Sequence, residues 1–122
     1  MNGITMIRTA VVLFAVAALG GVVMAIVRLS KNVNPPSWLA MLHGLLAAAG
    51  VTLLLYAAFA GGIPALATAG LLLILIAALV GLVLNLKYQW PRALLPTGVV
   101  FGHAAIAVVG FILVLLVAVK GH

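Results

Sequence analysis

Four long apolar segments, separated by short polar or glycine-rich connections, limit this chain to one kind of structure. The segments run over residues 9–29, 37–60, 65–86 and 95–119, and the charged residues lie at or near their ends. About 20 apolar residues in an α-helix are enough to cross a bilayer. Because the chain has only 122 residues, almost nothing remains for a soluble domain. We therefore predict one all-α transmembrane domain over residues 1–122, a four-helix bundle in the lipid bilayer.

Acidic and thiol side chains are absent, since the sequence contains no Asp, no Glu and no Cys. This excludes carboxylate proton relays, carboxylate general bases and hard-metal sites. It also excludes disulfides, iron–sulfur ligation and covalent attachment of c-type haem. The formal net charge of +6 comes from cations that are dispersed at the segment ends. No polar surface gathers them, so we expect no nucleic-acid binding.

The second half of the chain repeats the first half at a constant offset of 60 residues. Aligning residues 9–58 with 69–118 without gaps gives 13 identities in 50 positions. Residue types that are sparse within the apolar segments match as well: Pro36 with Pro96, His43 with His103, Gly21 with Gly81, and Gly50 with Gly110. We therefore predict two tandem helical hairpins, repeat 1 over about residues 9–60 and repeat 2 over about residues 65–119.

The cations also predict how the bundle is oriented. The connections after the first and third segments hold four cations, whereas the opposite side holds only Arg8 and Lys120. The positive-inside rule therefore places loops 1 and 3 in the cytoplasm and both termini outside. The membrane is expected to be a bacterial inner membrane. We expect the first segment to be retained rather than removed as a signal peptide, because residues 17–23 match residues 77–83.

Two of the three histidines lie inside apolar segments at matching depth. His43 and His103 each follow a proline by seven residues, so each lies roughly 10 Å into its helix from the side of the cationic loops. Gly21 and Gly81 lie at the same depth in the first and third segments. An ionisable residue at membrane depth is costly and is by default a candidate for function. The third histidine, His122, is terminal and is expected to be solvated.

A layer of two histidines and two glycines has a chemical interpretation. Haem iron in many electron carriers takes two axial imidazoles, and glycine leaves room for the flat macrocycle. Further small residues flank the histidines or follow them by four and seven residues on the same helix faces: Gly44, Gly102, Ala47, Ala107, Gly50 and Gly110. We therefore predict that His43 and His103 bind the iron of one haem b per chain.

The pattern resembles the four-helix cores of membrane b-type cytochromes, including the cytochrome b561-like group. In those cores, histidines on alternate helices hold haem and glycines on the intervening helices make space for it. The resemblance implies axial ligation by His43 and His103 and haem clearance at Gly21 and Gly81. This chain departs from the family pattern, because those cores commonly hold two haems on four histidines. With two intramembrane histidines, one chain is expected to hold one haem.

A bound haem has further implications. Four cations lie at the interface nearer to the histidines and are candidate partners of the haem propionates: Arg28, Lys31, Lys87 and Arg92. Each of them is equally well explained as an anchor to anionic lipid. Single electrons would pass to or from a quinone or a redox protein, so we expect an electron-transfer protein rather than a stand-alone enzyme. A homodimer or a place in a larger respiratory or photosynthetic complex is expected.

Three other interpretations stay open, and the absence of carboxylate side chains counts against one of them, a transporter. In a non-redox accessory subunit, the histidines would form structural hydrogen bonds between helices, and the glycines would serve close helix packing. In a pigment-binding subunit, each histidine would bind the magnesium of a chlorophyll-type pigment. The visible spectrum of the purified protein distinguishes these interpretations from the cytochrome.

Overall fold

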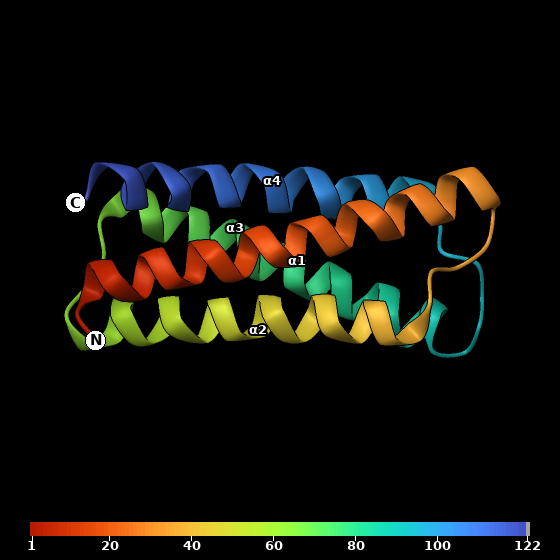
Figure 1. Cartoon of the computed structure of the whole chain (residues 1–122), viewed down its shortest axis with the longest axis horizontal. Coiled ribbons are helices and arrows are strands. Elements are labelled where there is room, and N and C mark those ends of the chain that lie inside the picture. Colours follow the sequence, from red (N-terminus) through yellow and green to blue (C-terminus); the bar gives the residue numbers. More distant parts are fainter. Residues whose placement is uncertain (122) are drawn as a thin grey trace.

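Four long helices form the predicted transmembrane bundle in the computed structural model, which describes residues 1–121 (Figure 1). The helices are α1 (Gly3–Lys31), α2 (Ser37–Ala60), α3 (Ala65–Val83) and α4 (Thr97–Lys120), and a π-helical turn, η1 (Leu84–Gln89), continues α3. All four spans, with η1 included in the third, are long and apolar enough to cross a membrane. The expected position of His122 lies outside the described residues.

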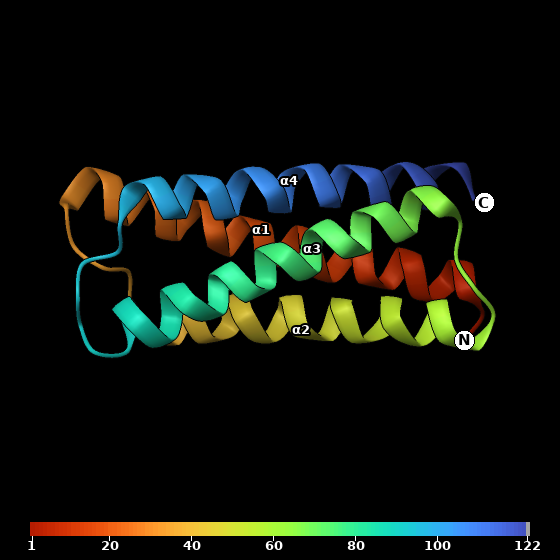
Figure 2. The ribbon, with the colours of Figure 1, turned by 180° about the vertical axis from the view of Figure 1, so that it is seen from behind.

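Consecutive helices form two antiparallel hairpins. The most extensive contacts are between α1 and α2 and between α3 and α4, and smaller contacts join α1 to α4 and α2 to α3. α2 and α4 lie on opposite sides of the bundle, while α1 and α3 cross between them on the two faces (Figures 1 and 2). Both termini and the turn between α2 and α3 lie at one end, here called the terminal end. The two cationic loops lie at the other, here called the loop end.

Local chemistry explains where the first and last helices differ from the predicted segments. α1 begins at Gly3, six residues before the expected start, because the side chain of Asn2 caps it by accepting a 2.9 Å hydrogen bond from the Thr5 N–H. α4 begins at Thr97 rather than at residue 95. Leu95 precedes Pro96, and the residue before a proline is disfavoured in the α conformation.

The two hairpins are equivalent in their packing as well as in their sequence. The burial of residues 41–50 matches that of residues 101–110 at every position. Gly50 leaves the space that Phe14 fills, since an added Cβ would lie 2.5 Å from the Phe14 ring. At the positions 60 residues later, a Cβ on Gly110 would lie 2.9 Å from Ile74. The predicted internal repeat therefore describes the three-dimensional arrangement.

The buried apolar core occupies the terminal half of the bundle. Its residues come from the first half of α1 and α3 and the second half of α2 and α4: Ile7, Ala10, Phe14, Leu54, Ala67, Leu71, Ile74, Val114, Val117 and Ala118. Closer to the loop end, the buried hydrophobic residues at the level of the two intramembrane histidines are Ala17 and Ala77. The histidines therefore lie beyond the main core, at a level where the fully buried side chains are small.

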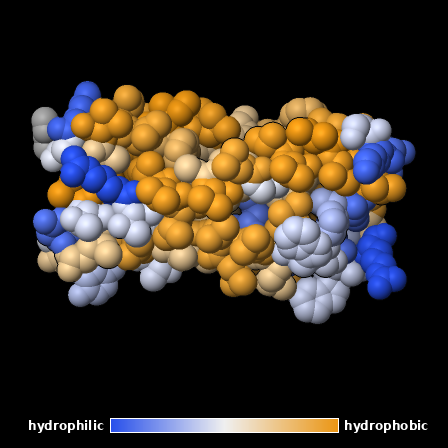
Figure 3. All heavy atoms as spheres, viewed as in Figure 1, coloured by the Kyte–Doolittle hydropathy of each residue, from blue (hydrophilic) through white to orange (hydrophobic). Residues whose placement is uncertain are grey.

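The outer surface suits a lipid environment. Apolar side chains dominate the middle of the visible face, and most of the hydrophilic ones gather at the two ends (Figure 3). Large hydrophobic residues are exposed on all four helices, for example Leu19, Leu45, Leu79 and Val108. In water such a surface would be unfavourable, whereas in a bilayer it is the surface that contacts the acyl chains.

Candidate metal-binding site

The His43 side chain reaches from α2 to the backbone of α1. Its Nδ1 donates a 2.6 Å hydrogen bond to the carbonyl oxygen of Ala17, and the residue is half-buried. That carbonyl also accepts the helical hydrogen bond from the N–H four residues later, at Gly21. A helical side chain covers the turn that precedes it, so a side chain at Gly21 would lie over the Ala17 carbonyl. Glycine leaves this oxygen accessible to the imidazole.

The His103 side chain makes the same contact in the second hairpin. Its Nδ1 donates to the carbonyl oxygen of Ala77 at 2.7 Å, and Gly81 is the residue four positions later. A Cβ on Gly81 would lie 3.0 Å from Cε1 of His103, and a Cβ on Gly21 would lie 3.1 Å from Cε1 of His43. The two glycines therefore face the imidazoles directly, and each makes room for the ring of its own hairpin.

These hydrogen bonds fix the tautomer of both histidines. A carbonyl oxygen can only accept, so the proton of each neutral ring is on Nδ1. Nε2 then carries the lone pair, which is the form of imidazole that binds a metal. Metal-ligating histidines commonly donate their other N–H to a backbone carbonyl, and this fixes the ring orientation. Within residues 1–121, neither Nε2 takes part in a hydrogen bond.

The two imidazoles lie next to each other between α2 and α4. Their ring centroids are 6.2 Å apart, and the ring planes make an angle of 72°. Two imidazoles on opposite sides of one metal ion would have ring centres roughly 6 Å apart, because each ligating nitrogen lies about 2 Å from the metal. The separation of the two ring centroids is therefore close to the one that a shared metal would require.

The other predicted small residues divide into two groups. Gly50 and Gly110 are buried in helix–helix contacts, one with Phe14 and the other with the backbone of Gly70. Gly44 and Gly102 are exposed, and a Cβ on either would meet nothing within 4 Å. Ala47 and Ala107 are half-buried one turn beyond the histidines. Among the predicted glycines, Gly21 and Gly81 are therefore the two that lie against the imidazoles.

The four predicted cations all lie at the loop end, but in different surroundings. Arg28 is buried, and its Nε donates to the carbonyl of Leu95 at 2.8 Å while Nη1 donates to Asn32 at 3.0 Å. Lys31 and Lys87 are exposed, the latter 5.6 Å from the centre of the Tyr88 ring. Arg92 is exposed at the edge of a cavity beside loop 1. Arg28 thus joins α1 to the segment that precedes α4.

Two residues of the site were not predicted from the sequence: Ala17 and Ala77, which contribute only carbonyl oxygens. A backbone acceptor has no residue-type signature of its own. The available signal was the spacing of alanine and glycine by four residues, which recurs at the offset of 60. Such a pair leaves a helical carbonyl uncovered.

Comparison of the chain with models of known protein families, with curated proteins and with solved structures gives no match. Within residues 1–121, no group of three or more histidine, cysteine or acidic side chains is placed to hold a metal ion. The candidate site in this part of the chain therefore consists of the two neighbouring imidazoles of His43 and His103.

Proposed function

We propose that this protein is a small b-type cytochrome of a bacterial inner membrane, in which Nε2 of His43 and Nε2 of His103 hold one haem b. The observation that carries the proposal is the pair of imidazoles, which share one tautomer and lie 6.2 Å apart. A haem held in this way supplies one-electron transfer. The chain would exchange electrons with a quinone or a redox protein, alone, as a homodimer or within a larger complex.

The chain itself contributes three features to this function. The carbonyls of Ala17 and Ala77 orient the rings and raise their basicity as ligands. The fully buried hydrophobic side chains at this level, Ala17 and Ala77, are small. Four cations at the loop end provide charge for the two haem carboxylates, and cation–carboxylate pairs are among the stronger hydrogen-bonded contacts.

Two alternatives are weaker on specific grounds. One pigment on each histidine would require two macrocycles near rings whose centroids are 6.2 Å apart, whereas one metal between the rings needs about that distance. The hydrogen bonds to Ala17 and Ala77 also suit a purely structural role. A structural role, however, uses only Nδ1 and gives no reason for two imidazoles that lie next to each other.

The test is the visible spectrum of protein purified from cells supplied with haem. We expect a reduced-minus-oxidised α-band of a bis-histidine b-type cytochrome, with about one haem per chain. Both His43→Asn and His103→Asn should abolish it, because an Asn amide nitrogen replaces Nδ1 as a donor to the carbonyl but offers no imidazole to a metal. His122→Asn is the matched control and should keep the spectrum.

The Asn variants separate the structural role from the ligand role. If they fold like the unsubstituted protein but are colourless, the histidines are ligands. If the unsubstituted protein is itself colourless, or if the Asn variants retain the spectrum, the cytochrome proposal is wrong. A spectrum with chlorophyll-type bands would instead favour the pigment-binding alternative.

A further inference from the structure

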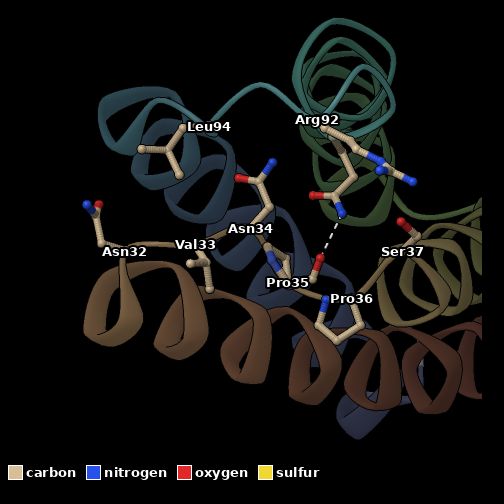
Figure 4. A pocket seen from close by; sticks show the side chains of 9 residues that line it. Asn32, Val33, Asn34, Pro35, Pro36, Ser37, Arg92 and Leu94 are labelled. Carbon is tan, nitrogen blue, oxygen red and sulfur yellow. Dashed lines mark hydrogen bonds between the residues drawn. The ribbon is translucent and has the colours of Figure 1, made fainter.

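A cavity at the loop end is distinct from the histidine pair. It has a volume of about 390 Å³ and is lined by loop 1 (residues 32–37) together with Gln89, Arg92 and Leu94 (Figure 4). Exposed Trp38 and Trp90 lie on the adjoining segments, and tryptophans typically mark the headgroup level of a bilayer. A ligand of this cavity would therefore meet it at the depth of the lipid headgroups.

Gln89 lines the cavity and holds a buried acceptor that has no partner within the described residues. The residue is only 8% exposed, and its Nε2 donates to the carbonyl of Pro35 at 2.7 Å, which fixes the orientation of the amide. Its Oε1 is buried and has no hydrogen-bond partner within the described residues. A buried polar atom without a partner costs free energy. A ligand that donates a hydrogen bond to this oxygen would therefore remove that cost.

The π-helical turn is what buries Gln89. The position 60 residues earlier, Leu29, belongs to the regular helix α1 and is 48% exposed. In η1 the Trp90 N–H donates to the carbonyl of Asn85, five residues earlier, rather than to one four residues earlier. The additional residue in the turn shifts the following side chains around the helix axis. The symmetry of the two hairpins is therefore broken at this cavity.

Arg92 supplies a positive charge at an energetic cost. Its φ of 61° is left-handed, as is the φ of 54° at Asn32, which is the equivalent position in loop 1. Asparagine adopts this conformation readily, whereas most other residues with a Cβ adopt it only at a cost in conformational energy. A strained arginine beside a cavity indicates a use for its guanidinium, which binds phosphate groups well.

We propose that this cavity binds the headgroup of an anionic phospholipid that carries a hydroxyl group, as phosphatidylglycerol does. The phosphate pairs with Arg92, and loop 1 shifts so that a glycerol hydroxyl reaches the buried Oε1 of Gln89 and donates to it. The chain has no acidic side chain that would repel the phosphate, and its formal net charge is +6. Basic pockets at helix ends on the interfacial side are typical lipid-headgroup sites.

The experiment measures lipid retained by the purified full-length protein after exchange into nanodiscs of phosphatidylcholine that contain an equal fraction of one test lipid. Phosphatidylglycerol is compared with phosphatidylmethanol, which has the same charge but no hydroxyl group. The unsubstituted protein should retain phosphatidylglycerol roughly fivefold better than phosphatidylmethanol. This is the change in affinity expected from the net contribution of one hydrogen bond. Gln89→Met, which keeps the length of the side chain but not its acceptor, should remove this preference.

Arg92→Gly separates binding from folding. It relieves the left-handed strain, so the midpoint of thermal unfolding should be equal or higher, while retention of both anionic lipids should fall roughly tenfold. Lys31→Gln, an exposed cation at the same end but outside the cavity lining, should change retention less than twofold. All measurements are independent of haem content.

Three outcomes would overturn the proposal. The first is equal retention of phosphatidylglycerol, phosphatidylmethanol and phosphatidylcholine by the unsubstituted protein. The second is unchanged retention in Arg92→Gly. The third is displacement of phosphatidylglycerol by soluble glycerol 3-phosphate at equal concentration, which would assign the cavity to a free phosphate ester rather than to a lipid.

Discussion

At the scale of single residues, the site depends on glycines that expose a carbonyl. Gly21→Ala and Gly81→Ala would place a Cβ 3.1 Å and 3.0 Å from the imidazole of His43 and of His103. Each ring must then move from its carbonyl acceptor. We expect the free energy of unfolding of each variant to fall about 1–2 kcal/mol below that of a control Gly→Ala variant, since one buried hydrogen bond is weakened.

The control variant is Gly44→Ala, because a Cβ there meets nothing within 4 Å. It should be as stable as the unsubstituted protein or more stable by up to about 1 kcal/mol, from helix propensity alone. Equilibrium unfolding in mixed detergent micelles, followed by circular dichroism, measures both. Equal stability of Gly21→Ala and Gly44→Ala would contradict the proposed role of the glycine.

Arg28 is the second residue whose surroundings lead to a prediction. Arg28→Ala removes the donor to the Leu95 carbonyl, a buried contact between positions 67 residues apart in the chain. We expect a loss of about 1–3 kcal/mol in the free energy of unfolding, because a buried acceptor loses its partner. Lys31→Ala, at an exposed position of the same helix end, should stay within about 0.5 kcal/mol of the unsubstituted protein. A similar effect of both would show that Arg28 acts only as a surface charge.

At the scale of the helices, glycine also determines how closely the second hairpin packs. A Cβ on Gly70 would lie 2.8 Å from the carbonyl oxygen of Gly110, and one on Gly110 would lie 2.9 Å from that of Gly70. Gly70→Ala must therefore push α3 and α4 apart, and overpacking of this kind typically costs about 1–3 kcal/mol.

The first hairpin offers the comparison. A Cβ on Gly50 meets the Phe14 ring, which is a side chain and not a backbone. Phe14→Leu should therefore rescue at least half of the stability lost in Gly50→Ala, measured by the same unfolding experiment. In the second hairpin, adding Val114→Ala to Gly70→Ala should restore a smaller share of the lost stability. The Cβ added at position 70 would still meet the backbone carbonyl of Gly110. Equal rescue in both hairpins would contradict a backbone contact between α3 and α4.

The sequence predicted the helices better than their ends. Long apolar runs identify membrane spans, so the bounds of α2 were predicted at both ends and those of α3 at its start. The cap at Asn2 and the start at Thr97 depend on single polar or proline residues next to the runs. The π-helical turn was not predictable, because one additional residue in a turn leaves the apolar pattern unchanged.

The candidate site was predicted to a similar extent. Depth along the helices, counted from the loop end of each segment, placed the two histidines and the two glycines in one layer, and in the structure each glycine lies against the histidine of its own hairpin. The contacts that orient the rings were not predictable, because they use the backbone oxygens of Ala17 and Ala77. The burial of Gln89 was not predicted either, because it depends on the π-helical turn. Leu29, the residue 60 positions earlier in the repeat, is exposed.

At the scale of the whole molecule, the two ends of the bundle differ in charge, and this predicts its orientation. The loop end carries Arg28, Lys31, Lys87 and Arg92, and the terminal end carries Arg8 and Lys120. We expect the loop end to face the cytoplasm. Because the chain contains no cysteine, single substitutions report this orientation without background. In intact spheroplasts, a membrane-impermeant maleimide should label Ala60→Cys and should not label Ser30→Cys or Thr97→Cys.

Removing charge should change this result in a defined way. Lys31→Gln together with Lys87→Gln leaves two cations at each end, so the bias that fixes the orientation disappears. In that background Ser30→Cys and Ala60→Cys should each be labelled in part from both sides of the membrane. Labelling of Ser30→Cys from outside in the otherwise unsubstituted chain would reverse the orientation. A change at Lys31 and Lys87 without any effect on labelling would show that the cations of loops 1 and 3 do not determine it.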